Sequence, residues 1–109
     1  MDIFDASRAG NLERVRELLA QGIDVNARDD YGRTPLMIAA TRAVPHHLPV
    51  VRELIYNGAD VNARNNSGES ALLHAVKSNN LPIVQELIAG GADVNGHNNE
   101  GVIQEILIA

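Results

Sequence analysis

The stretch that decides the fold is Gly-Ala-Asp-Val-Asn-Ala-Arg at residues 58–64. Closely similar stretches stand at residues 22–28, Gly-Ile-Asp-Val-Asn-Ala-Arg, and at residues 91–97, Gly-Ala-Asp-Val-Asn-Gly-His. The leading glycines Gly22, Gly58 and Gly91 are 36 and then 33 residues apart, so the period is 33 with one insertion of three. A repeat of this length indicates a solenoid in which each unit packs on its neighbours.

Within each period, apolar residues recur at the spacing of one helix face. These residues are Val15, Leu18 and Leu19, then Val50, Val51, Leu54 and Ile55, then Ile83, Val84, Leu87 and Ile88. A shorter apolar helix is predicted before each of them, at Ile3–Ala9, Pro35–Arg42 and Ala71–Ser78. We expect Thr34 to cap the middle one, and the glycine that opens each repeated stretch to end the second helix of its pair. Each period is therefore predicted to be a helix pair.

Two motifs in register identify the type of repeat. Gly-Arg-Thr-Pro-Leu-Met-Ile-Ala-Ala at residues 32–40, with Gly-Ala-Asp-Val-Asn-Ala at 58–63, resembles the ankyrin repeat over nearly the whole chain. The resemblance implies an all-α fold, a solenoid of stacked antiparallel helix pairs joined by β-hairpin-like loops. We expect a single domain over residues 1–109, with a truncated first repeat at 1–28, full repeats at 29–64 and 65–97, and a partial fourth at 98–109. The family's histidine after Thr-Pro-Leu is replaced by Phe4, Met37 and Leu73.

Charge and composition exclude several classes of function. The 109 residues carry 14 acidic and 9 basic side chains, a net charge of −5, which argues against a general nucleic-acid binder. Without cysteine, the chain has no thiolate zinc site and no cysteine nucleophile. No apolar run approaches the roughly 20 residues of a membrane span. We expect a cytoplasmic protein with neither nucleic acid nor membrane as a partner.

The polar residues that could carry chemistry favour structural roles. Ser70 and His74 are four residues apart, but Ser70 stands where Thr34 caps the preceding repeat. The four histidines, His46, His47, His74 and His97, do not converge readily, and we expect the adjacent pair to lie in a solvated turn after Pro45. Two ladders of equivalent turn residues are predicted to be structural: Asp24, Asp60 and Asp93, and Asn26, Asn62 and Asn95. We therefore predict no enzyme activity, no cofactor and no bound metal.

The resemblance implies that a protein partner binds the concave face, which is formed by the hairpin tips and the first helices. Carried over residue by residue, the predicted contact residues are Tyr31, Arg33, Arg42, Thr41, Asp30, Arg8, Arg64, Asn66, Ser67, Glu69, Lys77 and Ser78. Six of the nine basic residues fall in or beside this face: Arg8, Arg28, Arg33, Arg42, Arg64 and Lys77. We expect a locally positive groove with Tyr31, Arg33 and Arg42 as anchors. The alternative is that these cations pair with Asp29, Asp30 or Glu69.

The sequence thus predicts a protein–protein interaction module. The alternative is a partnerless scaffold, engineered or cut from a longer ankyrin protein. Such a scaffold would form a weak homo-oligomer through an apolar C-terminal helix containing Ile103, Ile106, Leu107 and Ile108. A metal-binding or hydrolytic protein that uses the histidines is a third, less favoured reading.

Overall fold

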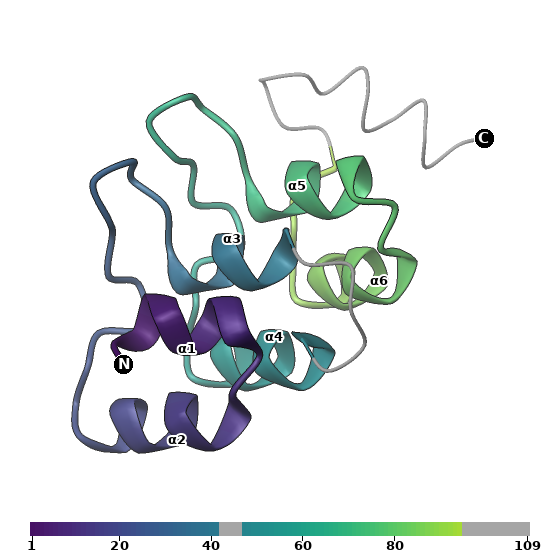
Figure 1. The fold of residues 1–109 in the computed structure, drawn as a ribbon. Coiled ribbons are helices and arrows are strands. Elements are labelled where there is room, and N and C mark those ends of the chain that lie inside the picture. Colours follow the sequence, from purple (N-terminus) through teal and green to yellow (C-terminus); the bar gives the residue numbers. More distant parts are fainter. Residues whose placement is uncertain (42–46, 95–109) are drawn as a thin grey trace.

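The computed structural model describes residues 1–41 and 47–94, and over these residues the chain forms six helices in three successive pairs. Helices α1 (Ile3–Ala9), α3 (Pro35–Ala40) and α5 (Ala71–Lys77) form one layer, and α2 (Leu12–Ala20), α4 (His47–Tyr56) and α6 (Leu81–Ala89) form the other. Loops project together from one side of the stack (Figure 1). The predicted all-α architecture of helix pairs is confirmed, and the only β-bridge in the described residues is an isolated antiparallel one between Arg64 and Ser70.

Two predicted helix ends differ slightly from the structure. The middle first-layer helix was expected to reach Arg42 and ends at Ala40, where Thr41 caps it. The third was expected to reach Ser78 and ends at Lys77, with Ser78 as its cap. The backbone amides of both cap residues still donate to carbonyls of the last turn, so each predicted range includes the cap. Arg42 itself lies outside the described residues.

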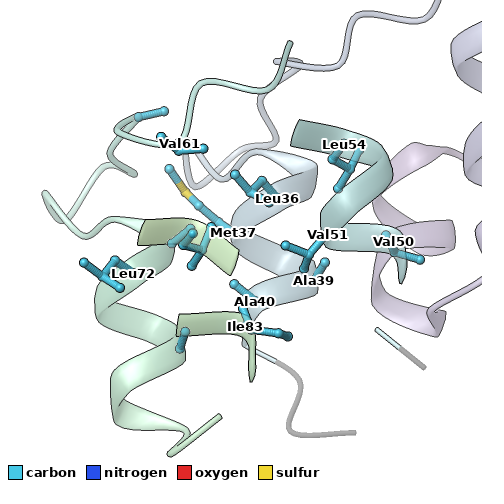
Figure 2. Close-up of a cluster of buried hydrophobic side chains, with 14 of the residues drawn as sticks. Leu36, Met37, Ala39, Ala40, Val50, Val51, Leu54, Val61, Leu72 and Ile83 are labelled. Carbon is cyan, nitrogen blue, oxygen red and sulfur yellow. The ribbon is translucent and has the colours of Figure 1, made fainter. Parts of the chain in front are cut away.

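The core runs between the two layers. Ala39 and Ala40 on α3 are fully buried, and their small side chains allow the close approach that the sequence predicts. Figure 2 shows α3 with Val50, Val51 and Leu54 of α4 on one side and Leu72 and Ile83 on the other. Leu54 and the equivalent Leu87 are fully buried, and Leu18 at the same position of the first pair is 6% exposed. One continuous apolar core therefore passes through all three pairs.

The predicted helix signals are confirmed. The Thr34 hydroxyl accepts the amide of Met37 at 3.3 Å, and the Ser70 hydroxyl accepts the amide of Leu73 at 3.2 Å. Ser70 is therefore a helix cap, as predicted. Gly22, Gly58 and Gly91 follow the second helices with φ between +91° and +99°, a conformation that favours glycine.

The asparagine ladder joins neighbouring repeats. Asn26 donates from Nδ2 to the carbonyl of Gly58 at 3.2 Å and accepts the amide of Asp60 at 2.8 Å. One repeat later, Asn62 donates to the carbonyl of Gly91 at 3.1 Å and accepts the amide of Asp93 at 2.7 Å. The aspartate ladder acts within each turn, because the carboxylates of Asp24 and Asp60 accept the amides of Asn26 and Asn62. The structural interpretation is therefore confirmed for Asp24, Asp60, Asn26 and Asn62. The third turn, from Asp93 to Asn95, is not tested, because Asn95 lies outside the described residues.

His47 does not lie in a solvated turn, so that expectation was wrong. It is the first residue of α4, and only 3% of it is exposed. Its Nε2 lies 2.7 Å from the carbonyl oxygen of Arg8, in the last turn of α1. The last carbonyls of a helix accept no hydrogen bond from amides of the same helix. Here the imidazole of His47, from the next repeat, donates to one of them.

Two further expectations concern the C-terminal end and membranes. The predicted partial fourth repeat at 98–109, with its apolar helix, lies outside the described residues. Among the helices of residues 1–41 and 47–94, none is long and apolar enough to cross a bilayer.

Candidate protein interface

The first hairpin tip is organised around the carboxylate of Asp29. Its Oδ1 accepts the backbone amides of Tyr31 at 2.9 Å and Arg33 at 2.8 Å, and its Oδ2 accepts Nε of Arg33 at 2.7 Å. Partial burial acts to raise the pKa of the Asp29 carboxyl, but the hydrogen bonds from Arg33 and Tyr31 outweigh it and lower that pKa below its ordinary value. The ionised carboxylate therefore fixes the loop and one cationic side chain at once.

The second tip has the same backbone arrangement, with an amide in place of the carboxylate. Oδ1 of Asn65 accepts the amides of Ser67 at 2.9 Å and Glu69 at 3.0 Å. Its Nδ2 donates to Oε1 of Glu69 at 3.1 Å. Since Asn65 lies 36 residues after Asp29, these are equivalent positions of two repeats, and each holds a tip rigidly.

The two tips are also bonded to each other. The amide of Asn66 donates to the carbonyl of Tyr31 at 2.9 Å, and its Nδ2 donates to the carbonyl of Asp30 at 3.2 Å. Gly32 makes this approach feasible: its φ is +75°, and a Cβ at this position would overlap the side chain of Asn66. The predicted contact residues of the tips thus form one connected surface.

Tyr31 and Arg33, both predicted as anchors, lie together on this surface. The Tyr31 residue is 66% exposed, and the guanidinium carbon of Arg33 lies 5.0 Å from the centre of its ring. At this distance the guanidinium makes a cation–π contact with the ring. The ion pair with Asp29 fixes Arg33, and Arg33 in turn orients Tyr31. An exposed tyrosine with a fixed orientation loses little side-chain entropy on binding.

The first helices supply the remainder of the concave face. Arg8 of α1 pairs with Asp5 at 3.1 Å, and Lys77 of α5 pairs with Glu69 at 3.4 Å. The Thr41 hydroxyl donates to the carbonyl of Ile38, while the Ser78 hydroxyl donates to the carbonyl of Thr41 at 3.2 Å. Thr41 and Ser78 thus link the ends of α3 and α5.

The cations predicted for this face have different kinds of partner. Arg8, Arg33 and Lys77 each have a carboxylate partner, and Arg28 donates from Nη1 to the carbonyls of Gly32 and Arg64. Arg64 is half-buried beside the bridge to Ser70. Of the six cations, Arg33 and Lys77 pair with carboxylates that the alternative names, Asp29 and Glu69, while Arg8 pairs with Asp5. The positive charge expected for the groove stays a prediction.

His74 lies at the edge of the same cluster. Its Nε2 is 4.0 Å from Oε1 of Glu69 and makes no hydrogen bond. Burial lowers the pKa of the His74 imidazole, an effect that the charge of Glu69 only partly opposes. The pKa of Glu69 is lowered chiefly by the hydrogen bond from Asn65, with the neighbouring cations adding to it. The described residues contain no group of three side chains arranged to hold a metal ion.

Several residues that shape the molecule were not singled out from the sequence. Asp29 and Asn65, which organise the tips, were missed as a ladder, although both precede the tip glycine by three residues. On the outer layer, Arg16 pairs with Glu53 at 3.1 Å and Arg52 with Glu86 at 2.9 Å. The recurrence of Arg-Glu at 16–17 and again at 52–53, one repeat apart, is the signal that could have revealed these contacts.

A family model described as ankyrin repeats (3 copies) matches residues 3–98. The chain belongs to the ankyrin-repeat family. Ankyrin repeats are generally protein–protein interaction modules and are typically non-enzymatic.

Shorter similarity links the chain to two curated proteins. It is 50% identical over 38 residues to the mitochondrial disaggregase of Bos taurus and 47% identical over 38 residues to that of Homo sapiens. The matched segment is 35% of this chain and only 6% and 5% of those proteins. The similarity thus concerns about one repeat's length of sequence.

Proposed function

We propose that the protein binds a protein partner through its concave face, using the hairpin tips and the first helices. The observation that carries this proposal is the exposed Tyr31 ring, fixed by Arg33, which is in turn fixed by Asp29. Tyrosine and arginine are the types most enriched at binding hot spots. Around them lie exposed polar groups of the second tip, namely Asn66 and Ser67.

Rigidity supports the proposal as much as composition does. The loops are cross-linked by backbone bonds between Tyr31 and Asn66, and the helix ends by the bond from Ser78 to Thr41. Because the surface is ordered before association, binding loses little conformational entropy. We propose a cytoplasmic location for this activity, and a single domain built from the repeats at 1–28, 29–64, 65–97 and 98–109.

Affinity capture followed by mass spectrometry, with the full chain as bait, tests the proposal. The Tyr31→Ala variant should bind the specific partner at least about tenfold more weakly, since replacing a hot-spot tyrosine by alanine costs about 2 kcal/mol or more. Gln85→Ala on the exposed surface of α6 is the matched control and should capture the partner normally. Equal capture by wild type and Tyr31→Ala would sink the concave-face assignment.

A further inference from the structure

The outer layer of helices carries a shallow groove. It lies along α4, is bordered by α2 and α6, and has a volume of about 510 Å³. Pro49, Arg52 and Tyr56 line it at intervals of three and four residues, so they form one stripe along α4, roughly 10 Å long at 1.5 Å per residue. Leu12 and Arg16 of α2 form the opposite side. We call this surface the outer groove.

Apolar and aromatic groups in the outer groove are open to solvent. The Tyr56 residue is 87% exposed, the most exposed of the large apolar residues in residues 1–41 and 47–94. Pro49 is exposed as well, and Leu12 is half-buried beside it. Leu54, two residues before Tyr56, is fully buried in the core, whereas the Tyr56 ring lies outside it.

The charged groups of the outer groove are arranged asymmetrically. Arg16 and Arg52 use Nε to reach Glu53 and Glu86, and their side chains are 59% and 60% exposed. The two glutamate side chains are only 21% and 29% exposed. Each arginine side chain is therefore more exposed than the carboxylate that orients its Nε. A guanidinium held in this way can bind a further carboxylate through two parallel hydrogen bonds.

We propose that the outer groove is a second docking surface, and that it binds an acidic amphipathic helix of another protein. Acidic side chains of that helix would pair with Arg16 and Arg52, and its apolar face would lie on Leu12, Pro49 and Tyr56. A helix is favoured over an extended strand because the described face is built of helices without a sheet edge, and because a two-turn stripe matches anchors spaced three, four and seven residues apart. This surface is independent of the concave face, which lies on the other layer.

The test uses a phage-displayed library of random peptides, depleted on the full-length Tyr56→Ala variant and then selected on the wild-type chain. The enriched peptides should carry aspartate or glutamate together with apolar residues at helical spacing. Enrichment of basic or uncharged peptides, or no enrichment above the depleted library, would overturn the proposal.

Fluorescence anisotropy with one labelled enriched peptide then locates the contact. Binding should weaken about tenfold in the Arg16→Gln/Arg52→Gln double variant, by loss of the paired hydrogen bonds. The matched control is Tyr31→Ala, which removes the other strongly exposed tyrosine and should leave the affinity unchanged. A larger loss in Tyr31→Ala than in the double variant would place the peptide on the concave face and overturn the outer groove. Circular dichroism of each variant ensures that the compared proteins are equally folded.

Discussion

The ion pairs on the two faces of the molecule differ in what they connect. On the concave face, each ion pair of the described residues lies within one repeat, as between Asp29 and Arg33. On the outer layer, Arg14–Glu17 lies within one helix, but the pairs Arg16–Glu53 and Arg52–Glu86 join one repeat to the next. The concave charges therefore orient side chains locally, whereas the contacts between repeats are made by the core, the asparagine ladder and the outer pairs. A substitution should be costly for folding where it breaks a contact between repeats and mild where it breaks a contact within one.

The largest expected effect is that of Gly32→Ala, because it disrupts a close approach between repeats. The new Cβ would overlap Asn66 and would also occupy a positive φ, so we expect a loss of about 2–4 kcal/mol in the free energy of unfolding. Gly22→Ala is the control: its φ is also positive, at +91°, but no atom lies within 4 Å of the added Cβ. It should cost only about 1–2 kcal/mol, from backbone strain alone. Urea unfolding followed by circular dichroism measures both, and equal losses would contradict the account of Gly32.

A middle-sized effect is expected for Asn62→Ala, which removes two hydrogen bonds to the following repeat. At about 1 kcal/mol for each bond, the loss should be about 1–2 kcal/mol. Asn57→Ala provides the comparison within a repeat, because Asn57, which directly follows α4, donates to the carbonyl and carboxylate of Glu53 in the last turn of that helix. We expect less than about 1 kcal/mol there, since an exposed local bond contributes little. Thermal unfolding measures both variants. A larger loss of stability in Asn57→Ala than in Asn62→Ala would contradict the claim that contacts between repeats matter more for folding.

The smallest effect is expected for Asp29→Asn, which makes the first tip resemble the second. The amide oxygen still accepts both backbone amides, as Asn65 does, so only the pair with Arg33 is lost, at about 0–1 kcal/mol. Folding lowers the pKa of Asp29, so its ionised form stabilises the fold above the unfolded carboxyl pKa of about 3.9. This contribution is lost as the pH falls from that value through the folded pKa.

Unfolding midpoints at several pH values check this sign. The difference between wild type and Asp29→Asn should be present at neutral pH and should shrink in strong acid. Asp30→Asn controls for the removal of one negative charge from the same exposed tip. A difference that grows as the pH falls would show that the ionised carboxylate does not stabilise the tip.

The sequence predicts the fold well because the repeat places the same physical requirement at equivalent positions. Gly22, Gly58 and Gly91 end helices, Asn26 and Asn62 join neighbouring repeats, and these roles follow from residue type and period. Helix ends at Ala40 and Lys77 were predicted less accurately, since the cap residues Thr41 and Ser78 have helical backbone angles themselves.

For the proposed interface, the exposure of a residue was easier to predict from the sequence than its charge partners. Exposure of Tyr31 follows from its place at a turn, but the pairing of Arg33 with Asp29 depends on side-chain geometry across a tight loop. His47 shows the limit most clearly. Its burial depends on a carbonyl of α1, 39 residues earlier in the chain, a contact that no local pattern reveals.

The most direct test of the central claim is an amide chemical-shift map of the isotopically labelled chain with its captured partner. Our account predicts that the shifted amides cluster at residues 29–33 and 65–69 and at the ends of α3 and α5. The asparagine ladder should stay unperturbed, because it belongs to the framework. Shifts confined to α2, α4 and α6, with the hairpin tips unchanged, would contradict the claim that the concave face binds this partner.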